Sequence, residues 1–206
     1  MSPIIDRQRR LAEIGRIRMG DRKQGNRPGR PRETWRLTSR VKERLESAAR
    51  VYGGTVQAWD GQWELLTETN ALHVMVAPGE AVSQFYELWS AGGCQRRCDG
   101  ATESISDQPC LCDPEKRECN VHTRFSVILP HVPGLGLWRL ETSGYYASVE
   151  LAPTAEFVQG LGTNLMCVLR IDHREVKRDG QTKKFAVPIL DADVAPLALM
   201  GGQAPA

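Results

Sequence analysis

The sequence predicts an α+β fold, in which an antiparallel sheet is formed by two βαββ-like halves with helices on one face. The order strand–helix–strand–strand occurs twice, over residues 34–68 and 136–190, and an Asp-Gly turn joins the last two strands each time. Between the halves, five cysteines and a histidine fall within 29 residues, which predicts a Cys-rich zinc-binding insertion. We expect a flexible N-terminus (1–12), a single domain (13–194) with the insertion at about 90–122, and a flexible tail (195–206).

The elements of the first half follow from apolar periodicity and from turn residues. Residues 13–20 (EIGRIRMG) alternate imperfectly and predict a short strand, and residues 34–38 predict the next one. Ser39 stands at the expected N-cap of a helix that reaches Tyr52 and ends at Gly53-Gly54. The last predicted elements of this half are a hairpin with strands 55–59 and 62–68 around Asp60-Gly61, and a strand over 71–76.

The second half repeats this order. A strand over 136–141 carries a Trp-Arg-Leu run that also occurs at residues 35–37. Residues 144–160 predict a helix that Pro153 must kink or split, because proline lacks the N–H that the helix needs. Strands over 164–177 and 183–190 follow, joined at Asp179-Gly180, and the isolated Cys167 is expected in the core.

The cysteine segment predicts a metal site. Its spacing is C-x3-C, eleven residues, C-x-C, six residues and C-x2-H, and the intervening residues are polar and turn-forming. A fully thiolate zinc site leaves no open coordination position, so the expected role is structural. The main alternative is a set of free cysteines that merely pack. An iron–sulfur cluster is a further alternative, although such clusters often show more regular short spacings. Six candidate ligands compete for four positions: Cys94, Cys98, Cys110, Cys112, Cys119 and His122. One residue of the C-x-C pair is a potential bystander.

Charge is unevenly distributed along the chain. Residues 1–50 hold 15 Lys/Arg and 6 Asp/Glu, a net charge of +9, whereas the remaining 156 residues hold 12 and 19, a net charge of −7. The basic half includes a Gly/Pro/Arg-rich run that cannot form a regular element and suits a phosphate backbone. A solvated loop explains the same run equally well. The candidate nucleic-acid contacts are Arg27, Arg30 and Arg32.

Recognisable catalytic motifs are absent from the sequence. It has no nucleophile elbow, P-loop or dinucleotide-binding glycine pattern, and the one H-x-E, at 173–175, lacks the cysteine pair of zinc deaminases. Asp191 and Asp193 could bind a divalent ion, but two solvent-facing carboxylates at a strand end are the more ordinary explanation. The apolar runs are too short for a membrane span, and the N-terminus has no signal-peptide core. We expect a cytoplasmic protein.

Several runs of the sequence, taken together, resemble one family. They are EIGRIRMG (13–20), WRLTS (35–39), VYGGTVQAW (51–59), FYELWSAGGCQRRCDG (85–100), PCLC (109–112), TRFSVILPHVPGLGLWRLETSGYYASVEL (123–151) and KKFAVPILDADV (183–194). The most specific part is the GGC-x3-CDG segment followed by P-G-L-G-x-W-R-L-E-x-x-G-Y-Y. The chain resembles the recombination directionality factors of actinophages over roughly residues 12–194.

The resemblance implies a protein with no reaction of its own. Members of the family bind a phage large serine integrase and change which synaptic complex is productive, so that excision (attL × attR) is favoured and integration (attP × attB) is inhibited. The implied contact is with the coiled-coil region of the integrase, in the cytoplasm of the host bacterium. DNA is then reached indirectly, through the integrase complex. His122 departs from the expected family pattern, which leaves the fourth metal ligand open.

The surface that binds the partner is not fixed by any motif. Exposed aromatic and arginine side chains are the usual anchors of such surfaces, which makes Arg96, Arg97, Tyr145 and Tyr146 the candidates. A different function, a zinc-containing DNA-binding regulator that uses the basic N-terminal arm, is the alternative. It predicts that the chain alone binds duplex DNA with a steep salt dependence.

Overall fold

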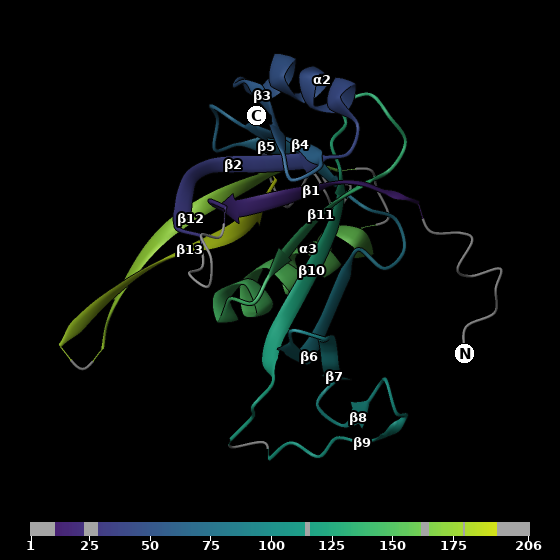
Figure 1. Cartoon of the computed structure of the whole chain (residues 1–206), viewed down its shortest axis with the longest axis vertical. Helices are drawn as coiled ribbons and strands as arrows, with labels where there is room; N and C mark the ends of the chain where they lie inside the picture. The colour runs from purple at the N-terminus through teal and green to yellow at the C-terminus, as the bar shows by residue number, and fades with distance from the viewer. Residues whose placement is uncertain (1–10, 23–28, 114–115, 162–164, 179, 193–206) are drawn as a thin grey trace, which may run out of the picture.

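The computed structural model describes residues 11–22, 29–113, 116–161, 165–178 and 180–192, and most of them lie in strands (Figure 1). Residues 1–10 of the predicted flexible N-terminus (1–12) and the whole of the predicted tail (195–206) are outside the described residues. In chain order the elements are β1 (Glu13–Gly20), β2 (Pro31–Ser39), α2 (Lys42–Tyr52), β3 (Val56–Trp59), β4 (Gln62–Leu66), β5 (Leu72–Val76), β6 (Val82–Ser90), β7 (Gly93–Cys98), β8 (Thr102–Glu103), β9 (Gln108–Pro109), β10 (Asn120–Ile128), β11 (Leu137–Thr142), the π-helical turn η1 (Ala147–Leu151), α3 (Ala152–Gly160), β12 (Met166–Arg178) and β13 (Gln181–Asp191).

The strands of the described residues belong to one mixed sheet. Its main path is β3-β4-β2-β1-β11-β10-β6-β7-β8-β9, and β5 connects β10 to the β12–β13 hairpin. β1 runs parallel to β11, with Arg16 opposite Arg139 and Ile17 opposite Leu140. The prediction of a wholly antiparallel sheet is therefore wrong at this joint. Apolar alternation identifies strands, but it does not give the direction in which two halves meet.

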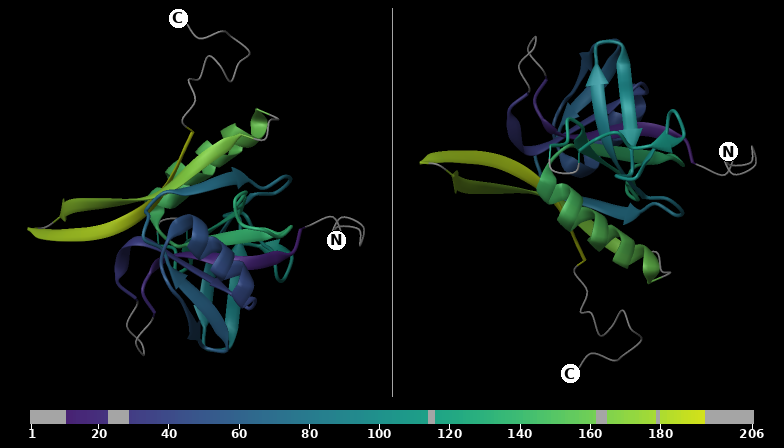
Figure 2. Two further views of the ribbon diagram at one scale, coloured as in Figure 1. Left: turned by 90° about the horizontal axis from the view of Figure 1, so that it is seen from above. Right: turned by 90° about the horizontal axis from the view of Figure 1, so that it is seen from below.

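The predicted strand–helix–strand–strand order is present in both halves. In the first half, Asp60 and Gly61 both have positive φ (46° and 69°), as the tight turn between β3 and β4 requires. The halves differ in pairing, because β4 returns to β2, with Leu65 opposite Leu37, whereas β12 pairs with β5 and not with β11. The long β12–β13 hairpin consequently projects from the body of the molecule (Figures 1 and 2).

Ser39 does not cap α2 as predicted. The residue before the helix is Val41, which has extended backbone angles, and no side chain caps the first turn. The Ser39 hydroxyl instead donates to the Ile14 carbonyl (2.8 Å) and accepts the Val41 N–H (3.2 Å). It thus ties the end of β2 to β1. Pro153 acts as predicted, since the helical segment widens into η1 immediately before it and continues as α3.

Two central strands, β6 and β10, were missing from the sequence prediction. β10 alternates as a half-buried strand should, with Thr123, Phe125 and Val127 buried. β6 pairs with β10 on one side and with β7 on the other. The cysteine segment therefore begins as a continuation of the sheet, and its lobe, β7 to β9, lies at one end of the molecule (Figure 1).

One apolar cluster forms the core on a single side of the central strands. It contains the largest buried side chains, Trp35 and Trp138, and Cys167 is fully buried within it as predicted. α2 contributes Leu45, Ala48 and Tyr52, and the second helical segment contributes Leu151, Ala155 and Val158. No cysteine of the 94–119 segment belongs to this cluster, so the lobe is held by other interactions.

Candidate metal centre and charged sheet face

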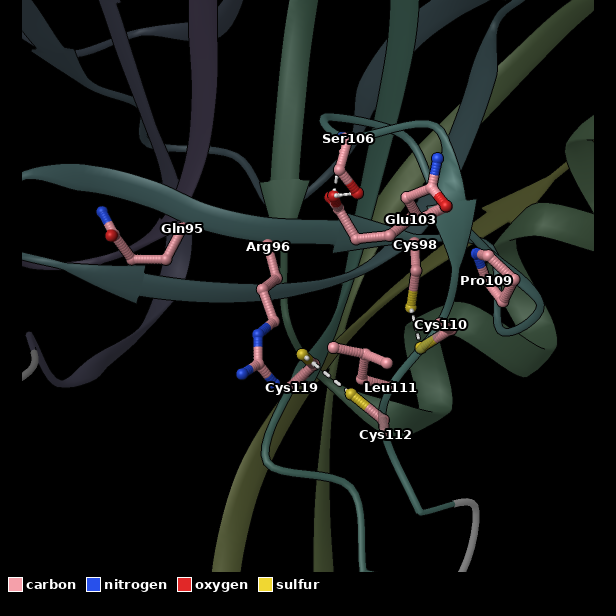
Figure 3. A pocket seen from close by; sticks show the side chains of 11 residues that line it. Gln95, Arg96, Cys98, Glu103, Ser106, Pro109, Cys110, Leu111, Cys112 and Cys119 are labelled. Carbon is pink, nitrogen blue, oxygen red and sulfur yellow. Dashed lines mark hydrogen bonds between the residues drawn. The ribbon is translucent and has the colours of Figure 1, made fainter.

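Four of the six predicted ligands meet in one pocket of the lobe. Cys98 is the last residue of β7, Cys110 and Cys112 follow β9, and Cys119 directly precedes β10. The Sγ atoms of Cys98 and Cys110 are 3.3 Å apart, and those of Cys112 and Cys119 are 3.6 Å apart. Figure 3 shows the two sulfur pairs on the wall of this pocket. Both residues of the C-x-C pair, Cys110 and Cys112, therefore line this pocket.

The donor set fits a tetrahedral thiolate site, with one adjustment. Zn–S bonds of about 2.3 Å in a tetrahedron place the sulfur atoms about 3.8 Å apart. The separation within each pair is close to that value. Among the described residues, however, no three of these sulfur atoms lie within 4.8 Å of one another. A bound ion would draw the two pairs together and would tie β7, the 110–112 loop and the start of β10 to one point.

The four thiols differ in acidity. Burial raises the pKa of Cys98, and burial together with the neighbouring Cys112 thiol raises that of Cys119 to about 11. The Cys112 backbone N–H and the hydrogen bond with Cys98 lower the pKa of Cys110. Since zinc binds thiolates, a metal ion entering this pocket must displace protons from the buried thiols.

Carboxylates organise the turns around the pocket. Glu103 accepts hydrogen bonds from the Ser106 hydroxyl (2.6 Å) and from the backbone N–H groups of Arg97, Ile105 and Ser106. These bonds lower the pKa of Glu103 to about 2. Asp99 accepts the N–H groups two and three residues further on in the same way. Polar turns of this kind shape the lobe without an apolar core, as its composition predicts.

The remaining two predicted ligands lie elsewhere. Cys94 is opposite Trp89 in the β6–β7 pair, and its Sγ contacts the Arg96 carbonyl at 3.2 Å. His122 lies on the polar face of β10, where its Nδ1 is 3.9 Å from Glu87. Neither side chain lines the sulfur pocket. The six candidates therefore divide into a quartet and two outlying residues.

Glu87 forms the centre of a buried charge network on this polar sheet face. Its side chain is fully buried and accepts two bonds from Arg124 (2.8 and 2.7 Å), one from Arg97 (2.7 Å) and one from the Trp89 indole (2.8 Å). Burial alone would raise the pKa of Glu87, but these hydrogen bonds outweigh it and lower the pKa to about 2. The network joins β6, β7 and β10.

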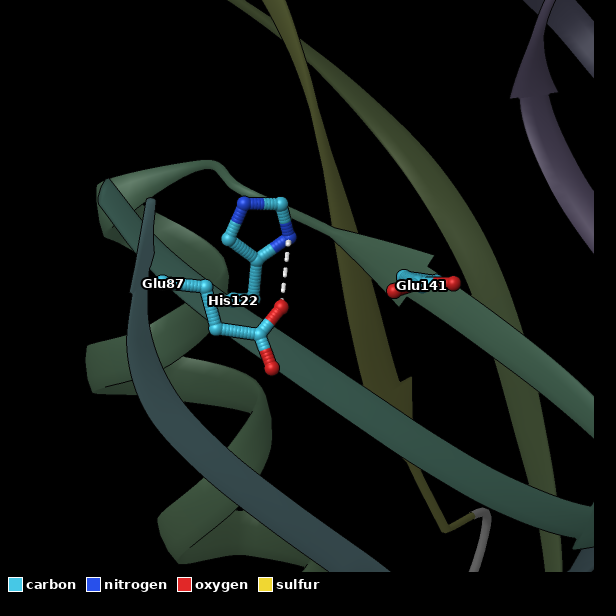
Figure 4. A group of neighbouring side chains, drawn as sticks. All are labelled: Glu87, His122 and Glu141. Carbon is cyan, nitrogen blue, oxygen red and sulfur yellow. Dashed lines mark ion pairs between the residues drawn. The ribbon is translucent and has the colours of Figure 1, made fainter. Parts of the chain in front are cut away.

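The same carboxylate is poorly suited to a metal ion. Ligand atoms of Glu87, His122 and Glu141 lie within 4.8 Å of one another (Figure 4). The Arg124 guanidinium, however, binds both Glu87 and Glu141 (2.7 and 3.0 Å). A cation placed there would face this fixed positive charge and would have to displace it. The group is better explained as a structural ion network.

The predicted partner residues do not form one surface. Arg97 is engaged with Glu87, and Arg96 is partly exposed beside the sulfur pocket. Tyr145 is 68% exposed on the second helical segment, whereas Tyr146 stacks on Phe185 at 5.1 Å.

The predicted nucleic-acid contacts are only partly described. Arg30 is exposed, and Arg32 forms an ion pair with Asp21 at 2.6 Å. Arg27 lies outside the described residues.

A second basic surface was missed by the sequence analysis. Arg16, Arg18, Arg40 and Arg44 line one pocket. Thr38 and one carboxylate, Glu13, also line it, and Glu13 pairs with Arg16 at 2.8 Å. Arg18 lies over the Trp59 ring and forms no ion pair within the described residues. Burial, and then the neighbouring Arg36 and Arg16, lower its pKa. The alternation of arginines in EIGRIRMG places Arg16 and Arg18 on one strand face and could have revealed this surface.

Comparison with known proteins gives a match at the level of a family. A model of the Gp3-like family, described as recombination directionality factor-like, matches residues 14–193. No curated protein matches the chain, and no solved structure does. Within the described residues, no helix combines the length and the apolar character that a membrane span needs.

Replacing Glu87 tests the charge network. We expect Glu87→Gln to lower the free energy of unfolding at pH 7 by about 3 kcal/mol, because Arg124 and Arg97 lose their buried counter-ion. The folded-state pKa of Glu87 is below its ordinary value, so its stabilisation is present above that value and is lost as the pH falls toward 2. Urea unfolding of both proteins between pH 7 and pH 3 measures this.

The difference between wild type and variant should therefore shrink as the solution is acidified. A difference that stays constant with pH would contradict the assignment. Glu175→Gln is the control, because the exposed Glu175–Lys184 pair is expected to contribute less than about 1 kcal/mol.

Proposed function

The chain belongs to the recombination directionality factor-like family, and on that premise we propose that it binds a phage large serine integrase and switches it from integration (attP × attB) to prophage excision (attL × attR). The observation that carries this proposal is the family match, which extends over residues 14–193. The match supports a role in recombination and an interaction with a recombinase. The class of integrase and the direction of the switch are our proposal.

We propose that the protein acts by binding alone. A partner without a reaction of its own can redirect an enzyme only if it binds two conformations of that enzyme with different affinity. Moving an equilibrium from 1:99 to 99:1 needs about 5.5 kcal/mol of differential binding. A small number of well-packed anchor residues can supply that amount, provided that the surface holding them is rigid.

Three side chains with strongly shifted pKa values, Glu87, Glu103 and Arg174, fit a non-catalytic role. Glu87 is held by arginines, Glu103 by turn N–H groups, and Arg174 by the carboxylates of Glu150 and Asp172. Each shift therefore has a structural explanation, with partners that already satisfy the group. Shifted pKa values also occur at functional sites, but structural ion-pair networks of this kind produce them as well.

We also propose that Cys98, Cys110, Cys112 and Cys119 hold a structural zinc ion. The ion would neutralise the four thiolates and supply the cross-link that an apolar core supplies elsewhere. The pairwise sulfur distances and the absence of these residues from the core cluster support this assignment. The lobe would then be rigid where it continues β6 and β7.

Direct contact with duplex DNA is a second candidate function, and one observation favours it. Arg18 is partly buried between other guanidinium groups and lacks an ion pair within the described residues. Glu141 and Glu13 offset part of the repulsion at Arg18, and an anion bound between the guanidinium groups would offset more of it. A backbone phosphate has the required charge and geometry.

Recombination in vitro tests the main proposal. With the integrase of the same phage, we expect stoichiometric amounts of this protein to increase attL × attR recombination and to suppress attP × attB recombination. The measurement is the yield of each product with and without the protein. An unchanged yield for both substrate pairs, in the presence of active integrase, would contradict the proposal.

Metal analysis tests the zinc assignment. We expect about one zinc ion per chain in the wild type and a large loss of zinc and of thermal stability in Cys112→Ser. Cys94→Ser is the matched control and should keep its zinc, because Cys94 lies outside the quartet. Wild-type protein that is free of metal and stays folded in chelator would refute the assignment.

Fluorescence anisotropy with a short labelled duplex tests DNA contact. If the arginine pocket binds a phosphate, wild type should bind at about 50 mM salt, and the Arg18→Ala/Arg40→Ala double variant should show a smaller salt slope. Arg50→Ala is the control, because Arg50 is exposed on α2 away from the pocket. Equal binding by the double variant and the control would contradict DNA contact through the arginine pocket.

A further inference from the structure

The helical segment that contains η1 and α3 carries an exposed apolar stripe. Tyr145, Val149 and Phe157 are 68%, 46% and 61% exposed, and Pro153 between them is also exposed. These four residues are spaced four apart along the chain. We call this set, Tyr145, Val149, Pro153 and Phe157, the apolar seam.

The seam lies on the side of the helix that the core does not use. The opposite side, with Ala147, Leu151, Ala155 and Val158, is buried against the sheet. The core cluster therefore forms without any residue of the seam. Large side chains that remain exposed in a row are typical of a binding surface.

The helix is fixed in place, so the seam is presented rigidly. Glu150 forms a two-bond ion pair with Arg174 of β12 (2.6 and 2.8 Å). Tyr146 stacks almost parallel on Phe185 of β13. Figure 2 shows the helix from two sides, next to the β12–β13 hairpin. The two contacts hold the helix against this hairpin. A preorganised surface loses less entropy on binding.

The π-helical turn keeps the seam straight. In an α-helix, a residue four positions further on is rotated about 40° ahead around the axis. The wider π turn over Ala147–Leu151 rotates such a residue backwards, which offsets this drift. Side chains at every fourth position therefore stay in line over about 18 Å.

We propose that the apolar seam docks one amphipathic helix of the partner recombinase, an inference that rests on the function proposed above. A narrow straight row at this spacing matches the ridge of a single helix. Val149 and Phe157 would act as anchors, and Tyr145 would contact the partner helix at one end of the row.

Charge beside the seam indicates the chemistry of that helix. The β12–β13 hairpin borders the helical segment, and Lys183 lies two residues beyond Phe185 on the same hairpin face, opposite Val176. Lys177 is also exposed near the hairpin tip. Glu156 is exposed beside Phe157 at the other end of the seam. A partner helix with an acidic residue at the end that meets Tyr145, and not along its whole flank, fits this arrangement.

The size of the seam argues against a second copy of this chain as its occupant. A strip of about 18 Å by 10 Å is far smaller than the roughly 800 Å² that each partner buries in a stable complex. A homodimer through the seam alone would therefore be weak. A recombinase that also touches other parts of this protein can use the seam as one of several contacts.

Matched substitutions on two helices test the proposal. We expect Val149→Asp and Phe157→Asp each to weaken binding to the integrase of the same phage at least tenfold and to reduce excision accordingly. Val51→Asp on α2 is the control, because Val51 is also a helical valine with similar exposure (41% against 46%). The affinity of each variant is measured on surface-immobilised integrase, and circular dichroism checks that each variant is folded.

The outcomes separate this inference from the proposed function. Wild-type affinity in both seam variants would overturn the seam while leaving the integrase partnership intact. Failure of the wild type itself to bind the integrase would instead remove the proposed function, and the seam assignment with it. A wild-type dimer in solution that both seam variants abolish would assign the seam to a second copy and overturn the proposal.

Discussion

The pairing of β10 with three other strands is the constraint on which the rest of the structure depends. β10 hydrogen-bonds to β11, β6 and β5. Through β11 it reaches the first half, through β6 the cysteine lobe, and through β5 the projecting hairpin. Its inward side chains, Phe125 and Val127, are fully buried, while Arg124 on the outward side binds Glu87. One strand thus fixes the relative positions of the core, the lobe and the charged face.

The sequence predicted those elements whose signals are local. The Asp60-Gly61 turn, the alternation in EIGRIRMG and the break at Pro153 each act within a few residues, and each was found. The parallel joint between β1 and β11 depends on contacts more than a hundred residues apart, which no local pattern records. Ser39 shows the same limit, because its hydroxyl bonds to Ile14 on another strand instead of capping the helix that follows.

The candidate site was predictable to a similar degree. Spacing identified the cysteine segment, but only the fold separates Cys98, Cys110, Cys112 and Cys119 from Cys94 and His122. Considered alone, a C-x-C pair suggests that one of its two cysteines is not a metal ligand. The turn after β9 nevertheless brings Cys110 to Cys98 and Cys112 to Cys119. Exposure of Val149 and Phe157 also required the structure, since an apolar residue in a helical pattern is most simply assigned to the core.

We propose that the protein works by offering fixed surfaces to a partner and that it discriminates between two states of that partner. The most direct measurement is its affinity for integrase assembled on attL and attR against its affinity for integrase assembled on attP and attB. Our account predicts clearly tighter binding to the attL–attR assembly, because a ligand shifts an equilibrium only through differential affinity. Equal affinity for the two assemblies would contradict it.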